Sequence, residues 1–89
     1  MHIQKLEEIV IPVKVSQDRN LSHLDKLLYG VLYTLCKSSV TGNYMVRWID
    51  VSKICGCNAG HIKDCAEKLE KLGYIIIRPY GVKKSISIV

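Results

Sequence analysis

The sequence predicts an α+β fold in which three helices pack against a small antiparallel sheet. Apolar residues recur at helical spacing between residues 24 and 35, which indicates one amphipathic helix. A second helix is expected after Asn58, and two β-rich segments on either side of residues 79–82 predict a hairpin. With 89 residues, 48% of them hydrophobic, the chain is long enough for one domain, residues 1–89, with a single core.

The N-terminal segment Ile9–Val15 (IVIPVKV) is apolar and rich in β-branched residues, so it predicts an extended strand or arm. Pro12 has no N–H for a strand ladder, which favours an edge position. We therefore treat residues 1–20 as an extended N-terminal arm. Two roles stay open for it: the contact strand of a homodimer, or pairing inside its own domain.

The first long helix begins at a predicted capping box formed by Ser22 and Asp25. Its apolar side consists of Leu24, Leu27, Leu28, Val31, Leu32 and Leu35. The helix is expected to end near residues 37–39, and Gly30 inside it leaves room for another element to pack closely. After a turn around Gly42, residues 44–48 (YMVRW) predict a short strand.

Residues 49–72 predict two helices joined by a tight turn. A very short helix at residues 53–55, capped by Asp50 or Ser52, ends at Gly56. Asn58 is a favoured N-cap for the longer helix that follows, and Gly73 ends that helix. A turn of only a few residues between two helices is typical of a helix-turn-helix. Residues 74–89 then form the hairpin, with the turn placed at residues 79–82.

Residues 51–75 (VSKICGCNAGHIKDCAEKLEKLGYI) resemble the winged helix-turn-helix pattern, in which a Gly-containing turn precedes a recognition helix that ends in Leu-x-x-Leu-Gly-Tyr-Ile. The upstream segment IPVKVSQDRNLSHLDKLLYGVLYTL is similar to the N-terminal domain of bacterial plasmid and phage replication initiators and related helix-turn-helix regulators. The similarity covers nearly the whole chain. It implies binding of double-stranded DNA by a transcriptional regulator or by a replication or partition factor, with the hairpin as the wing.

The resemblance places the helix after Asn58 in the major groove and the wing on the DNA backbone. Asn58 and the amides of Ala59 and Gly60 then meet a phosphate at the helix start, while Lys63 and His61 reach phosphate or a base edge. Basic residues on the wing add phosphate contacts, and Tyr80 at its tip contacts a groove, a partner protein or nothing. The implied DNA-binding residues are Asn58, Ala59, Gly60, His61, Lys63, Arg78, Tyr80, Lys83 and Lys84.

The chain departs from this pattern on the recognition helix. The family often has Arg, Ser, Thr or Gln at the positions of Ala59, Gly60 and Asp64. Two acid–base pairs, Asp64 with Lys68 and Glu67 with Lys71, have the i,i+4 spacing of a charge-balanced, solvated helix face. Backbone binding is therefore favoured over base reading, and the alternative is a protein-interaction module on the same fold, for example an antagonist encoded by a mobile element.

The composition favours a polyanionic partner. The chain contains thirteen Lys and Arg residues and eight Asp and Glu residues, which gives a net charge of +5 and a pI near 9.1. No segment is long and apolar enough to span a membrane, and the N-terminus does not resemble a signal peptide, so a cytoplasmic protein without membrane contact is expected. The chain has no phosphate-binding glycine loop, catalytic carboxylate pair or nucleophile with a nearby base, so we expect neither an enzyme nor a cofactor.

Cys55, Cys57, His61 and Cys65 lie within eleven residues and include donor types that ligate zinc. His61 and Cys65 share a helix face at i,i+4 spacing. Against a metal, Cys65 lies on the core side of its helix and Cys57 stands where the pattern requires a small buried residue. We therefore expect these cysteines, and Cys36, to be buried structural thiols and expect no metal site.

Overall fold

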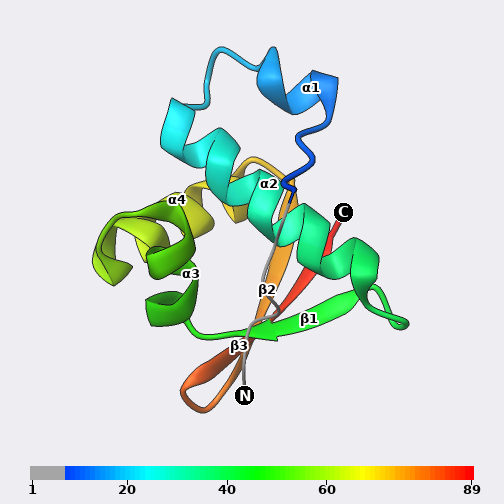
Figure 1. The fold of residues 1–89 in the computed structure, drawn as a ribbon, viewed down its shortest axis with the longest axis vertical. Helices are drawn as coiled ribbons and strands as arrows, with labels where there is room; N and C mark the ends of the chain where they lie inside the picture. Colours follow the sequence, from blue (N-terminus) through cyan, green and yellow to red (C-terminus); the bar gives the residue numbers. More distant parts are fainter. Residues whose placement is uncertain (1–7) are drawn as a thin grey trace.

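The computed structural model describes residues 8–89 and confirms the α+β class (Figure 1). Within these residues, four helices, rather than the three expected, accompany a three-stranded antiparallel sheet. The elements in chain order are α1 (Val13–Ser16), α2 (His23–Ser38), β1 (Asn43–Val46), α3 (Trp48–Cys55), α4 (Ala59–Lys71), β2 (Ile75–Tyr80) and β3 (Lys83–Ile88).

The sheet has the order β1-β3-β2, so the last strand of the chain lies in its centre. In β1, Val46 pairs with Lys84 of β3, and in β2, Ile77 pairs with Ile86. Helix α2 contacts β1 and β3, α4 contacts α2, α3 and β2, and the tip of the β2–β3 hairpin projects away from α1 and α2 (Figure 1). This arrangement is compatible with a winged helix in which the hairpin occupies the position of the wing.

Helix α2 supplies the centre of the core, and the structure confirms its predicted capping box. Ser22 Oγ accepts the Asp25 amide at 3.1 Å, and Asp25 Oδ2 accepts the Ser22 amide at 2.9 Å. The helix then buries its apolar side against α4 and the sheet. Its fully buried residues include Leu28, Val31, Leu32 and Leu35, which pack in one cluster with Val51, Ile62, Leu69, Ile75 and Ile86.

The strand predicted at residues 9–15 is wrong, because Val13–Ser16 forms the one-turn helix α1. The carbonyl of Pro12 accepts the amides of Val15 and Ser16 at 3.0 and 3.1 Å, and the Ser16 hydroxyl donates to the Val13 carbonyl. This turn places Val15 in the core at 0% exposure. Burial of one side chain therefore outweighs the extended preference of the β-branched residues around it.

The prediction that Gly30 admits a closely packed element is confirmed. The segment before α1 crosses α2 at this glycine, where a Cβ atom would lie 2.6 Å from Ile11 Cγ1 and 2.7 Å from Ile9 Cγ2. The Val10 amide donates to Thr34 Oγ1 at 3.0 Å on the same helix. Residues 9–11 therefore pack against their own α2, whereas residues 1–7 of the predicted arm lie outside the described residues.

Helix α3 is longer than the predicted helix at residues 53–55, because it begins at Trp48. Asp50 and Ser52 therefore lie inside the helix and are not its caps. Asp50 instead accepts the Arg47 Nε–H at 3.1 Å across the first turn, and the extra turn of helix buries Val51 fully. The tight turn itself agrees with expectation, since Gly56 ends α3 with φ +73°.

The hairpin turn is shorter than the predicted turn at residues 79–82, because Pro79 and Tyr80 belong to β2 and only residues 81–82 form the turn. Proline is tolerated here since β2 is an edge strand. Two features limit the outer edge of β2: Pro79 has no N–H, and the Ile77 amide donates to Glu70 Oε2 of α4 at 2.8 Å. The edge is thus partly closed to further strand pairing.

Candidate nucleic-acid interface

The start of α4 is built by Asn58 as predicted. Its Oδ1 accepts the His61 amide at 2.8 Å, so this oxygen is committed to the cap. Gly60 and His61 are exposed and Ala59 is half-buried. The opposite side of the helix buries Ile62, Cys65, Ala66 and Leu69. The predicted contact residues at the helix start therefore do lie on its outer side, but they present little side-chain surface apart from His61.

A hollow of about 250 Å³ separates the outer side of α4 from the hairpin and brings together two residues of the predicted set, Lys63 and Lys84. The helix contributes Lys63, Glu67 and Glu70 at i, i+4 and i+7 spacing. Its remaining lining residues are Trp48 at the start of α3, and Ile77, Pro79 and Lys84 of the hairpin.

The strand register divides the basic residues of the hairpin between two faces. Pro79 pairs with Lys84, and both face the hollow beside α4. Alternate residues point to opposite faces of a strand, so the neighbouring pairs, Arg78 with Ser85 and Tyr80 with Lys83, project to the other face. Lys63 and Lys84 are therefore assembled into one site, whereas Arg78, Tyr80 and Lys83 lie on the other face of the hairpin.

The hairpin tip exposes apolar as well as basic side chains. Tyr80 is 59% exposed and Val82 in the turn is 81% exposed. Val82 is not among the predicted contact residues, although its place in the turn of a hairpin between basic residues is a signal that could have identified it. The tip thus has an amphipathic character that suits contact with either a groove or a protein.

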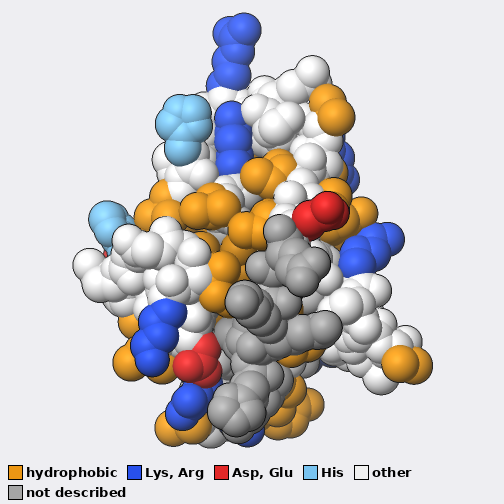
Figure 2. Space-filling model, viewed as in Figure 1, with side chains coloured by type: hydrophobic (Ala, Val, Ile, Leu, Met, Phe, Trp, Pro, Cys, Tyr) orange, Lys and Arg blue, Asp and Glu red, His pale blue; other side chains and the backbone are white. Residues whose placement is uncertain are grey.

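Charge on the outer side of α4 is mixed. Three acids, Asp64, Glu67 and Glu70, stand beside Lys63 and Lys71, so this side carries no positive excess. The helix pair predicted between Asp64 and Lys68 is replaced by a different one, because Lys68 Nζ donates to Asp25 Oδ2 at 2.7 Å. On the face in Figure 2, the visible Lys and Arg side chains stand apart from one another and do not form a single patch.

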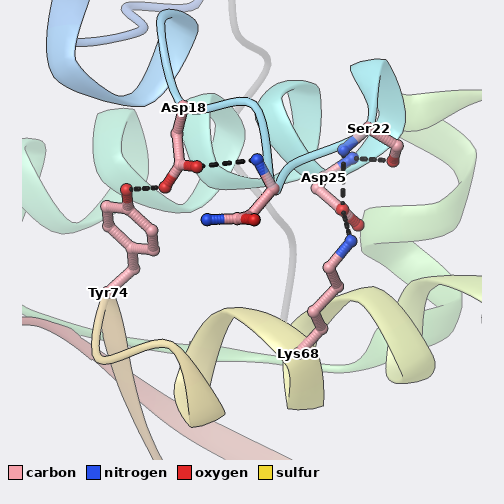
Figure 3. Close-up of polar contacts among 6 residues, drawn as sticks. Asp18, Ser22, Asp25, Lys68 and Tyr74 are labelled. Atoms are coloured by element: carbon pink, nitrogen blue, oxygen red, sulfur yellow. Dashed lines mark hydrogen bonds and ion pairs between the residues drawn. The ribbon is translucent and has the colours of Figure 1, made fainter.

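A polar network fixes α4 against the beginning of α2 (Figure 3). Asp25, 2% exposed, accepts hydrogen bonds from Lys68 Nζ and the Ser22 amide. Burial by itself raises the pKa of Asp25, but these hydrogen bonds outweigh it, so the net pKa lies below the usual value. The charged form of the carboxylate is therefore the one that holds α4 in place.

A second contact anchors the base of the hairpin to the loop before α2. The Tyr74 hydroxyl donates to Asp18 Oδ2, and Asp18 Oδ1 accepts the Asn20 amide at 2.8 Å (Figure 3). The bond from Tyr74, followed by that from Asn20, lowers the pKa of Asp18. The same bond raises the pKa of Tyr74 because it stabilises the protonated phenol.

The cysteines behave as the predicted core residues at two positions. Cys36 and Cys65 are buried, whereas Cys55 and Cys57 are half-buried. Burial raises the pKa of the Cys36 and Cys55 thiols to about 11, and burial together with the adjacent Asp25 raises the pKa of Cys65 to about 12. Within residues 8–89, no group of three or more His, Cys, Asp and Glu side chains is placed to hold a metal ion.

Comparisons of the chain with protein-family models, with curated proteins and with solved structures find no match. None of the helices formed by residues 8–89 has the length and apolar character needed to cross a membrane.

Proposed function

We propose that the chain is a winged helix-turn-helix domain that binds double-stranded DNA, chiefly through the phosphate backbone. The observation that carries this proposal is the convergence of Lys63 from α4 and Lys84 from β3 on one hollow. Two cations from different elements are thereby presented on the surface between the recognition helix and the wing. Phosphate contacts of this kind position a protein on DNA without reading its sequence.

The predicted residues take unequal parts in this proposal. Lys63 and Lys84 contact phosphates from within the hollow, and His61 and the amides of Ala59 and Gly60 act at the helix start. Arg78, Tyr80 and Lys83 join them only where the backbone curves over the far face of the hairpin. Base reading is weak, because acidic side chains occupy the middle of α4 and repel phosphate.

The biological role that the resemblance implies is that of a cytoplasmic transcriptional regulator, or of a plasmid or phage replication or partition factor. A homodimer on paired half-sites is the arrangement common to many helix-turn-helix proteins. Residues 9–11 pack on α2 of the same chain, so a dimer contact through this segment would have to form on top of that packing, and α2 itself is the other candidate surface. Light scattering with and without duplex DNA tests this point.

The test is fluorescence anisotropy with a labelled random-sequence duplex of about two helical turns at two salt concentrations. Removing one lysine–phosphate contact lowers the slope of log affinity against log salt by about 0.9. The variant Lys63→Ala/Lys83→Ala/Lys84→Ala is expected to bind more weakly and to lower the slope by about 2 to 3. Absence of binding to wild-type protein at low salt would exclude the proposal.

A matched control also removes three charges but takes them from elsewhere. Lys14→Ala/Lys37→Ala/Lys71→Ala removes exposed or peripheral lysines outside the hollow and the hairpin. This variant is expected to retain most of the wild-type affinity and slope. An equal decrease in both triple variants would mean that the interaction depends on net charge alone and not on this surface.

The alternative function is a protein-interaction module, and the composition of the hollow favours it. Glu67 and Glu70 balance Lys63 and Lys84 there, and Trp48 adds apolar surface. A mixed-charge hollow with an aromatic wall suits a protein partner better than a uniform polyanion. Charge reversal separates the two functions, since Glu67→Lys should strengthen DNA binding but disrupt a complementary protein contact, and it leaves the bond between Glu70 and the Ile77 amide in place.

A further inference from the structure

A second hollow, of about 440 Å³, lies on a different part of the molecule from the DNA surface proposed above. Its walls come from α1, from α2, from the loop at Gly42 and from the end of β3 at Ile88. Strand β3 passes both hollows, with Lys84 lining the first and Ile88 lining the second. The volume falls in the range of small-molecule sites, about 300–1,000 Å³.

Aromatic rings form one wall of this hollow. Tyr29 and Tyr33 lie one turn apart on α2 with their rings stacked, their centroids 5.8 Å apart and their planes at 26°. Tyr74 meets Tyr29 edge to face at 5.6 Å, which fixes the Tyr29 ring from behind. The wall is therefore held in place before any ligand arrives. Tyr29 is only 2% exposed, so the half-buried Tyr33 is the ring that a ligand in the hollow can contact.

The charged side chains of the lining are both basic. Lys14 and Lys37 line the hollow and no acidic side chain does. Lys37 Nζ lies 5.4 Å from the centre of the Tyr33 ring, so its ammonium is held beside the aromatic wall. In the part of the chain from residue 8 onward, neither lysine forms an ion pair with a carboxylate.

Apart from the two tyrosine hydroxyls and the two lysine ammonium groups, no side chain of the lining carries a nitrogen or oxygen atom. The Cys36 thiol donates to the Ile86 carbonyl at 3.3 Å, and Pro12, Gly42 and Ile88 present apolar or backbone surface. We therefore propose that this hollow binds a small aromatic carboxylate, with its ring against Tyr33 and its carboxylate between Lys14 and Lys37. The proposal does not depend on DNA binding.

The test is a ¹⁵N–¹H NMR titration of the full chain with 2-naphthoate, with 2-naphthamide as the uncharged isostere. We expect naphthoate to shift the amides of residues around the hollow, including Lys37, Gly42 and Ile88. Naphthamide should bind about tenfold more weakly, because it carries no charge for the two lysines to attract. Equal binding of the two compounds, shifts centred elsewhere, or no binding of naphthoate at millimolar concentration overturns the proposal.

Variants and a third ligand complete the design. Lys14→Gln/Lys37→Gln should weaken naphthoate about tenfold, whereas the matched control Lys53→Gln/Lys71→Gln should stay within about twofold of wild type. The spectra of the free variants show directly that each remains folded. Adenosine monophosphate carries a ring and an anion with a sugar between them, so tighter binding of that nucleotide than of naphthoate would overturn the assignment to a carboxylate.

Discussion

Asp25 is the residue on which two helices depend. Its carboxylate closes the capping box of α2 and accepts Lys68 of α4, so one buried side chain serves a local and a long-range role. Lys68 itself is 45% exposed at its side chain, which weakens the pair through solvent screening. The larger effect is the cost of leaving a buried carboxylate without its partner.

Replacing Lys68 with Met should therefore destabilise the protein more than its exposure suggests. The variant leaves Asp25 buried and removes one of its hydrogen bonds, and we expect the free energy of unfolding to fall by about 1–2 kcal/mol in urea at pH 7. Lys71→Met, on the exposed side of the same helix, is the control and should change that free energy by less than about 0.5 kcal/mol. Similar values for both variants would argue against a structural role for the Asp25 pair.

At the scale of elements, the contact between residues 9–11 and α2 is possible only because residue 30 is glycine. A glycine in a helix normally costs about 1 kcal/mol relative to alanine. Here its missing side chain leaves the space that Ile9 and Ile11 occupy. Gly30 thus lowers the intrinsic stability of the helix, but it allows the N-terminal segment to lie across it.

Gly30→Ala should release this segment without unfolding the domain. The new Cβ would clash with both isoleucines, while the helix gains propensity, so we expect only a small change in the free energy of unfolding. Amide exchange at Val10 should become much faster, because its hydrogen bond to Thr34 is broken. Gly60→Ala is the matched control, since its Cβ would meet only Asn58 Oδ1 at 3.4 Å. Unchanged protection of Val10 in Gly30→Ala would contradict this account.

For the whole molecule, the polar contacts around residues 18–25 make the free energy of unfolding depend on pH in the acid range. Asp18 holds Tyr74 at the base of the hairpin, Asp25 holds Lys68 on α4, and both carboxyls have a lowered pKa. A lowered pKa in the folded state contributes stability above the unfolded value of about 3.9, and this contribution is lost as the pH falls through the folded value.

We therefore expect wild-type protein to lose stability steeply below about pH 4. The variant Asp18→Asn/Asp25→Asn should be less stable than wild type at neutral pH, and the difference between the two should shrink as the pH approaches about 2. Urea unfolding monitored by circular dichroism over this pH range measures both curves. A difference that stays constant with pH would show that the two carboxylates act only through shape and not through charge.

Local signals in the sequence were sufficient for most of the fold. The caps at Ser22 and Asn58 and the glycine at position 56 each predicted an element boundary that the structure confirms. Tertiary contacts decided the rest. Helix α1 places Val15 in the core, and the early start of α3 places Val51 there. For the candidate interface, the outward position of Lys63 on its helix could be predicted from helical spacing. The division of the hairpin lysines between two faces could not, because it depends on the register of β2 with β3.

The bond from the Ile77 amide to Glu70 also bears on how the protein behaves at high concentration. A sheet grows into fibres by adding strands at an edge that has free amides. On the β2 side, that amide is occupied and Pro79 has none to offer. The other edge of the sheet is β1, whose four residues span only about 13 Å. Loss of the Glu70 side chain would therefore lengthen the β2 edge that is available for templated self-assembly. A variant in which Pro79 is also replaced should form fibrils after a shorter lag than either the single variant or the wild-type protein.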